Sequence, residues 1–176
     1  MQPTRMQPTH HAGLAVAVLT VSDTRSAADD RSGNYLVEQL QAAGHHVVEK
    51  TIVPDDIYQI RAVVSRWIAD AGVQVIITTG GTGVTGRDGT PEAIAPLLDK
   101  PIEGFGELFR QLSYADIKTA AIQSRAIAGV ANNTYLFTIP GSTGACKTAW
   151  EGILRDQLDP TYRPCNFATL LPRLGE

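Results

Sequence analysis

The chain has 176 residues, of which 43% are hydrophobic and 19% are charged, enough apolar material for one domain of ordinary size. With 15 Lys and Arg against 18 Asp and Glu, the net charge is −3. That balance argues against a general nucleic-acid binder, which needs a basic face to displace phosphate counterions. No segment reaches the roughly 18 apolar residues that spanning a membrane requires. Two cysteines form no disulfide framework, so we predict a cytoplasmic protein without nucleic-acid or membrane partners.

The start of the chain differs in composition from the rest. Residues 1–12 are polar, contain two prolines and lack an apolar run of signal-peptide type. We predict a flexible tail over 1–12, followed by a single domain over 13–176.

Apolar runs alternate with stretches of helical spacing along this domain. Residues 14–21 are apolar without alternation, which is typical of a strand buried on both faces in a parallel sheet. Later segments repeat the strand and helix patterns with short links, which predicts an α/β fold. The predicted strands are 14–21, 46–53, 73–79 and 134–139, and the predicted helices are 31–43, 56–71, one capped by Thr90, 102–114 and 143–158.

Polar loops follow three of these strands, at 20–24, 78–83 and 139–142. Ligands of open parallel sheets bind beyond the carboxyl ends of the strands. The glycines of the second and third loops allow positive φ and close approach of a ligand to backbone N–H groups, which bind phosphate oxygens. The alternative is that Gly-Gly-Thr-Gly is a plain strand-to-helix turn.

Two carboxylates, Asp55 and Asp88, lie near these loops in the sequence. A carboxylate beside a phosphate is unfavourable unless a cation lies between them. If both side chains reach one cleft, they form a sparse Mg²⁺ site completed by water and substrate phosphates. The alternatives are that Asp55 caps the helix over 56–71 and that Asp88 is only a turn residue.

Two interpretations are open for each of three other side chains. Cys146 near a helix start either has a lowered thiol pKa or is a small core residue. Arg110 and Arg125 interrupt apolar stretches, which places them at a site or interface, or on an ordinary helix surface.

Five motifs follow one another along the chain: LTVSD at 19–23, VPDD at 53–56, TGGTG at 79–83, RDGTPEA at 87–93 and PGS at 140–142. Taken together, they resemble the motifs of the molybdenum cofactor biosynthesis proteins of the MoaB/MogA family. The order of several motifs makes this resemblance specific, and it covers residues 12–167. Three stretches, 104–110, 123–130 and 163–167, are closest to the bacterial B branch.

The resemblance implies the molybdopterin-binding-domain fold, a three-layer α/β fold with a mostly parallel central sheet flanked by helices. It implies a homo-oligomer, either a trimer or a hexamer. The implied reaction uses Mg²⁺ as cofactor and ATP and molybdopterin as substrates. The terminal phosphate of molybdopterin attacks the α-phosphate of ATP and releases pyrophosphate. The implied partner is a downstream molybdenum-insertion protein that receives the adenylylated product.

Residue by residue, the resemblance implies that Asp55 and Asp88 are catalytic and bind the metal. The residues it implies for nucleotide or pterin binding are Ser22, Asp23, Thr79, Gly80, Gly81, Thr82, Gly83, Pro91, Glu92, Pro140, Gly141 and Ser142. Two positions depart from the family pattern. Gly89 stands where adenylylating members often carry a branched apolar residue, and Lys118 stands where the family commonly has Gly.

The sequence is also compatible with two alternative functions. One is a non-catalytic molybdopterin-binding or assembly member of the same family. The other is a flavin carrier, because VSDTRS at 21–26 faintly resembles the phosphate loop of flavodoxin-like proteins. The loops contain no Trp or Tyr in the places that would flank a flavin, which argues against the second.

Overall fold

A single six-stranded sheet forms the centre of the computed structural model, which describes residues 12–176. The predicted tail over 1–12 lies outside the described residues except for Ala12. The strand order is β2-β1-β3-β6-β5-β4; the first four run parallel, and β5 is antiparallel to both of its neighbours. The mostly parallel sheet is therefore confirmed. The strands are β1 (Ala15–Val21), β2 (His46–Val53), β3 (Val75–Thr79), β4 (Lys100–Pro101), β5 (Ile127–Ala131) and β6 (Thr134–Ile139).

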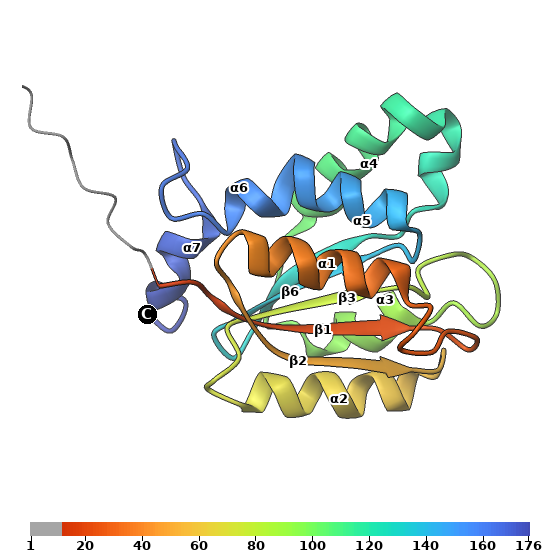
Figure 1. Cartoon of the computed structure of the whole chain (residues 1–176), viewed down its shortest axis with the longest axis horizontal. Coiled ribbons are helices and arrows are strands. Elements are labelled where there is room, and N and C mark those ends of the chain that lie inside the picture. The colour runs from red at the N-terminus through yellow and green to blue at the C-terminus, as the bar shows by residue number, and fades with distance from the viewer. Residues whose placement is uncertain (1–11) are drawn as a thin grey trace, which may run out of the picture.

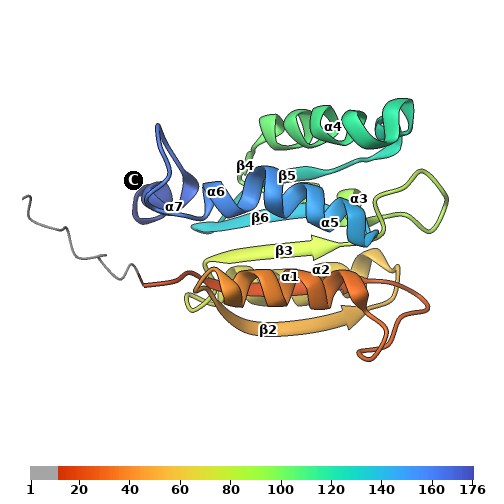
Figure 2. The ribbon, with the colours of Figure 1, turned by 45° about the horizontal axis from the view of Figure 1, so that its top comes forward.

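Helices cover both faces of the sheet and complete the three layers (Figures 1 and 2). α1, α5 and α6 lie on one face and α2 and α3 on the other, while α4 runs alongside β4 and β5 (Figure 2). A π-helical turn, Trp150–Leu154, joins α5 to α6. The helices are α1 (Arg31–Ala42), α2 (Ile57–Ala69), α3 (Thr90–Ile94), α4 (Glu103–Ile117), α5 (Thr143–Ala149), α6 (Arg155–Gln157) and α7 (Phe167–Leu170).

Each face of the sheet has its own hydrophobic core, because successive residues of a strand point to opposite faces. In β1, Val16 and Val18 pack with α1, α4 and α5, whereas Ala17 and Leu19 pack with α2 and α3. All four side chains are fully buried. The uninterrupted apolar run of this strand thus reflects its burial on both faces.

Several details of the elements differ from the sequence prediction. Thr90 was expected to cap its helix, but Gly89 occupies the N-cap and the Thr90 hydroxyl donates instead to the Gly80 carbonyl at 2.8 Å. The third strand begins at Val75, two residues later than expected. β5 was not predicted, because its sequence IAGVA is short and rich in small residues of low strand propensity.

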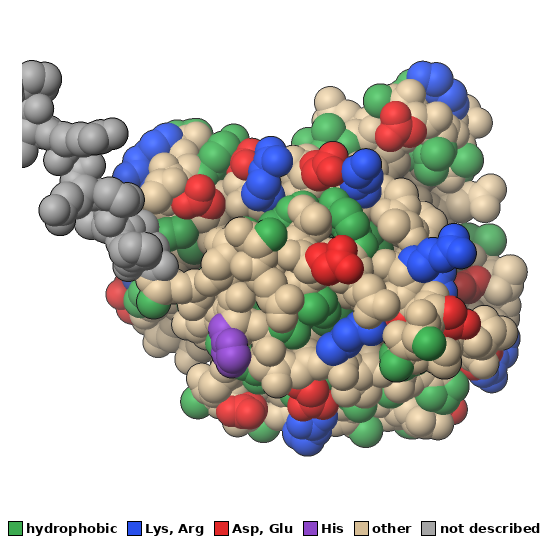
Figure 3. Space-filling view, in the orientation of Figure 1, with side chains coloured by type: hydrophobic (Ala, Val, Ile, Leu, Met, Phe, Trp, Pro, Cys, Tyr) green, Lys and Arg blue, Asp and Glu red, His purple; other side chains and the backbone are tan. Residues whose placement is uncertain are grey.

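Among residues 12–176, no helix is both long and apolar enough to cross a bilayer. On the face drawn in Figure 3, acidic and basic side chains are interspersed and do not gather into a patch of one sign.

The two departures from the family pattern have local explanations. A Cβ atom on Gly89 would lie 2.7 Å from Cγ2 of Ile57, so a branched residue there would require Ile57 to move. Lys118 ends α4 with φ 52° and ψ −134°, a backbone conformation that glycine adopts readily and other residues adopt only with strain.

Lys118→Gly is therefore expected to stabilise the protein by about 1 kcal/mol, the strain relieved minus the added chain entropy of glycine. The melting temperature should rise by about 2–4 °C. Ala115→Gly, in the interior of the same exposed helix end, is the matched control and should destabilise by about 1 kcal/mol. Equal loss of stability in both variants, measured by urea unfolding, would show that Lys118 is unstrained.

Candidate functional site

A cleft of about 470 Å³ opens at the carboxyl ends of β1, β3 and β6. Thr20 pairs with Thr79, and Thr79 pairs with Ile139, so the three strands end level and their loops meet at one edge of the sheet. Eleven of the predicted site residues line the cleft together, namely Ser22, Asp55, Thr79, Gly80, Gly81, Thr82, Gly83, Asp88, Pro140, Gly141 and Ser142.

The glycine loop has a backbone shape that the sequence predicted in outline. Gly80 and Gly81 have φ of 106° and 65°, which side chains would strain. A Cβ atom on Gly141 would lie 3.0 Å from the Cα of Gly80, so the second and third loops are in contact. Both glycine loops therefore need glycine for close backbone packing as well as for the turn.

The carbonyl groups of this loop, from Gly80 to Gly83, all accept hydrogen bonds from residues outside it. Thr90 donates to the carbonyls of Gly80 and Gly81 through its hydroxyl and its N–H, at 2.8 and 2.9 Å. Arg125 donates to the carbonyls of Thr82 and Gly83 at 3.2 and 2.7 Å. In a planar trans peptide the N–H lies opposite the C=O, so the N–H groups of residues 81–84 point away from Thr90 and Arg125. Amide donors turned in this way are of the kind that binds phosphate, and the N–H of Gly83 already bonds to the Asp88 carboxylate.

Asp55 is not the helix cap that the sequence allowed it to be. Asp56 caps α2 instead, accepting from the N–H groups of Tyr58 and Gln59, both at 2.9 Å. The side chain of Asp55 is thereby left to line the cleft. Its Oδ1 lies 2.7 Å from the position of a Cβ atom on Gly81.

Asp88 approaches the other end of the same loop. Its Oδ2 lies 2.6 Å from the position of a Cβ atom on Gly83 and accepts from the N–H and hydroxyl of Thr85 at 3.0 and 2.5 Å. The structure thus brings both predicted carboxylates to one glycine loop. Asp88 is also a turn residue, as the alternative interpretation has it, and its part in a metal site stays a prediction.

The two carboxyl groups differ in their electrostatics. Burial, together with the nearby charges of Asp23 and Asp88, raises the pKa of Asp55 above its ordinary value. Hydrogen bonds, first of all from the Thr85 side chain, lower the pKa of Asp88. A cation between the two carboxylates would relieve the repulsion that Asp55 experiences.

The donor set fits Mg²⁺ of the sparsely bound kind. Within residues 12–176 no group of three or more His, Cys, Asp or Glu side chains is arranged to hold a metal. Mg²⁺ commonly takes one or two carboxylates and completes its shell with water and substrate phosphates. Asp55 and Asp88 could supply those carboxylates.

Three predicted binding residues lie outside the cleft. Asp23 forms a bidentate ion pair with Arg87, at 2.6 Å for the shortest contact, and accepts from the N–H of Asp55 at 3.0 Å. Pro91 is buried in α3 and lines a neighbouring cavity, and exposed Glu92 forms an ion pair with Arg125. Asp23 thus joins the first loop to Arg87 and to the backbone of Asp55, while Glu92 contacts the loop only through Arg125.

Five residues that line the cleft were not among the predicted site residues: Thr20, Val21, Arg25, Gln123 and Ser124. Arg25 and Ser32 both donate to the carbonyl of Gly141, at 3.1 and 2.7 Å, and so join the first loop to the third. The only sequence signal for Gln123 and Ser124 was their place in a stretch of family resemblance.

Cys146 is a core residue, and the suggestion of a lowered pKa is wrong. Burial raises the pKa of its thiol to about 11, and the side chain is fully buried against Thr79. Cys165 is exposed.

Iodoacetamide at mildly alkaline pH is therefore expected to modify Cys165 alone in the native protein, because the Cys146 thiol is neither accessible nor ionised. Intact-mass measurement should show one adduct on the folded chain and two in urea. Two adducts on the folded chain would contradict the burial of Cys146.

The fold is that of an open α/β protein with a mostly parallel sheet. Its cleft lies at the carboxyl ends of the strands and is lined by a glycine loop and two carboxylates. The model of the family described as "Probable molybdopterin binding domain" matches residues 17–160, and the chain belongs to this family. It also resembles the Molybdenum cofactor biosynthesis protein B of Escherichia coli strain K12, with 58% identity over 152 residues covering 86% of this chain and 89% of that protein. The protein of the same name from Staphylococcus aureus strain Mu50 is 51% identical over 149 residues, covering 83% and 88%.

Solved structures agree with the sequence relatives. The crystal structure of a Molybdenum cofactor biosynthesis protein B has a TM-score of 0.78 at 40% identity and covers 94% of each chain. The tungsten cofactor synthesizing protein MoaB from Pyrococcus furiosus has a TM-score of 0.72 at 39% identity, covering 80% of this chain and 90% of that one. The predicted family and fold are thereby confirmed.

Proposed function

We propose that the protein acts in molybdenum cofactor biosynthesis as a molybdopterin adenylyltransferase. The observation that carries the proposal is the approach of Asp55 and Asp88 to the two ends of a loop whose carbonyls are all turned to Thr90 and Arg125. Amide donors and two carboxylates beside them suit a metal-bound polyphosphate.

The reaction requires little covalent chemistry from the protein. The terminal phosphate of molybdopterin attacks the α-phosphorus of ATP, a P–O bond to the β-phosphate breaks, and pyrophosphate leaves. Mg²⁺, when bound, neutralises charge on the phosphates. The chain's own part is to hold that ion through Asp55 and Asp88 and to position phosphate oxygens on the amides of the glycine loop.

The purified protein is expected to release pyrophosphate when given Mg²⁺, ATP and molybdopterin together. Omitting molybdopterin, or adding EDTA, should abolish the release. If molybdopterin binds but no pyrophosphate appears, the protein is the non-catalytic molybdopterin-binding member that the sequence left open.

The expected trimer or hexamer remains a prediction. Apolar side chains are exposed on α4 and just after it, from Leu108 at 41% to Ile122 at 83%. Such exposure is typical of a surface covered by a partner. Sedimentation at micromolar concentration should therefore show an oligomer, and a monomer would contradict the prediction.

A further inference from the structure

Arg125 contacts the glycine loop more extensively than any residue of the family motifs except Thr90. It belongs to the segment that leads into β5, which was not among the predicted elements. Its guanidinium donates to the carbonyls of Thr82, Gly83 and Asp88 at 3.2, 2.7 and 3.1 Å. It also pairs with the carboxylate of Glu92 in α3. One side chain thus joins the glycine loop, the backbone of Asp88 and the helix that follows.

We propose that Arg125 is a positioning residue that holds the phosphate-binding amides of the glycine loop and the backbone of Asp88 in their working geometry. The proposal rests on the function proposed above. Its physical basis is the planar peptide: by binding the carbonyls of Thr82 and Gly83, Arg125 turns the N–H groups of the next residues the opposite way. The five donors of a guanidinium in a rigid fork suit several carbonyls at once.

Glu92 explains how the guanidinium is oriented. Its carboxylate accepts a hydrogen bond from one Nη of Arg125. Nε of Arg125 then donates to the carbonyls of Thr82 and Gly83, and the other Nη donates to the carbonyl of Asp88. The contacts of Arg125 span sequence separations of 33 to 43 residues. The resemblance implied that Glu92 binds the nucleotide or the pterin. In this arrangement Glu92 acts on the binding loop indirectly, by orienting Arg125.

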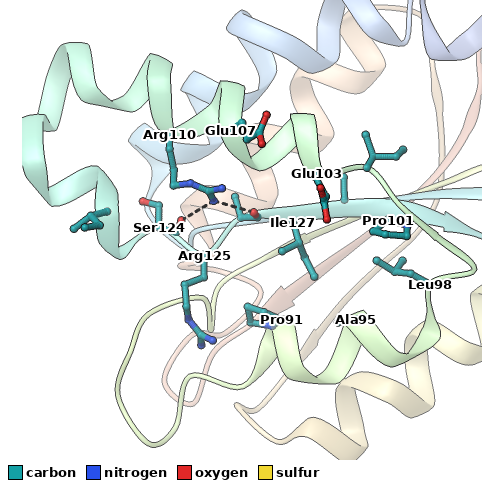
Figure 4. Close-up of a pocket in the computed structure, with 14 residues that line it drawn as sticks. Pro91, Ala95, Leu98, Pro101, Glu103, Glu107, Arg110, Ser124, Arg125 and Ile127 are labelled. Carbon is teal, nitrogen blue, oxygen red and sulfur yellow. Dashed lines mark hydrogen bonds between the residues drawn. The ribbon is translucent and has the colours of Figure 1, made fainter.

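A second arginine offers a matched control. Arg110 of α4 lines the same cavity of about 790 Å³ as Arg125 and donates to the carbonyls of Ser124 and Ala126, at 3.2 and 3.3 Å. Figure 4 shows Arg110 reaching from α4 to this segment, whereas Arg125 points away from α4, toward the helix that contains Pro91. Removing Arg110 therefore removes an equal charge and backbone contacts on the same wall without touching the glycine loop.

Hydrogen exchange of the unliganded full chain tests the proposal without any catalysis. In Arg125→Gln the hydrogen-bonded amides of Thr85, Asp88 and Thr90 are expected to exchange about tenfold faster, because the loop loses the carbonyl contacts that anchor it and opens more often. Arg110→Gln should leave exchange in this loop unchanged. Arg125→Lys keeps the charge but has one amine for four acceptors, so the loop should still exchange faster than in the wild-type protein.

Affinity for Mg·ATP, measured by calorimetry, gives the second readout. It is expected to fall about tenfold in Arg125→Gln and to change less than about twofold in Arg110→Gln. Loop exchange that is unchanged in Arg125→Gln, or fully restored by lysine, would overturn the proposal. If the wild-type protein itself fails to bind Mg·ATP, the proposed function fails, while the exchange result still decides whether Arg125 holds the loop.

Discussion

Replacing Asp55 with asparagine is expected to lower the rate of pyrophosphate release about a hundredfold or more. The amide keeps the shape of the side chain but removes one of the two negative charges that would hold Mg²⁺. The loss should appear in the turnover number with saturating ATP and molybdopterin, because the missing charge acts on the bound phosphates. Radiolabelled ATP would give the rate, and Asp88→Asn should behave alike.

The same substitution is not expected to harm the fold. Burial and neighbouring carboxylates already disfavour the charged form of Asp55, as its raised pKa shows, so a neutral amide relieves repulsion. Thermal unfolding without ligand should show Asp55→Asn at least as stable as the wild-type protein. Greater stability with lost activity is the signature of a strained functional group.

Two further variants make this prediction specific. Asp56→Asn changes the adjacent carboxylate, but asparagine caps a helix as well as aspartate does, so both activity and stability should be retained. The double variant of Asp55 and Asp88 should be no worse than the more damaged single variant, because both side chains serve one ion. Fully additive losses would mean that the two carboxylates act independently.

The sequence predicted the parallel part of the fold well because its signals there are local. β2 and β6 were predicted with the bounds that the structure shows, and α1 to within one residue. Apolar runs and turn residues determine such elements over a few positions. β5 was missed because its small residues carry little local strand signal and form a strand through pairing with β4 and β6.

The loops of the candidate site could be predicted from the sequence. The contacts that join these loops to distant side chains could not. The ends of parallel strands meet at one edge, so the glycine loops could be placed together in advance. Which of Asp55 and Asp56 would cap α2 could not be decided, because adjacent aspartates are equally good caps. Arg125 and Arg25 act on loops far away in the sequence. The apolar surroundings of Arg125 made it a candidate for a site or an interface, but no local pattern shows which loop it contacts.

Beneath the cleft, the structure depends on a buried carboxylate that no motif indicated. Asp30 is fully buried and caps α1 by accepting from the N–H of Gly33 at 2.9 Å. The Thr20 hydroxyl donates to it at 2.7 Å and Lys50 pairs with it at 2.9 Å. Arg25, the residue that joins the first and third loops, lies 3.6 Å from its other oxygen. Asp30 thus supports β1, α1 and the cleft at once.

Asp30→Asn is expected to destabilise the protein by about 2–4 kcal/mol, because a half-buried lysine loses its counter-charge and the amide nitrogen faces donors. Asp29→Asn is the matched control, since this neighbouring carboxylate is exposed and bonds only to Ser26 among the described residues. Urea unfolding at neutral pH should show little change for the control. A small effect of Asp30→Asn would mean that water reaching Lys50 replaces the carboxylate.

The pH dependence of this difference tests its electrostatic origin. Burial acts to raise the pKa of Asp30, but hydrogen bonds from Lys50, Thr20 and Gly33 outweigh it and hold the pKa below its ordinary value. A carboxyl group whose pKa is lower in the folded than in the unfolded protein stabilises the fold at pH values above its pKa in the unfolded chain, about 3.9 for Asp. This stabilisation is lost as the pH falls through the pKa of the folded state. The difference between the wild-type protein and Asp30→Asn should stay constant from neutral pH to about 4 and shrink below that. Other carboxyl groups titrate alike in both proteins and cancel, so a difference that persists in acid would assign the loss to packing rather than to charge.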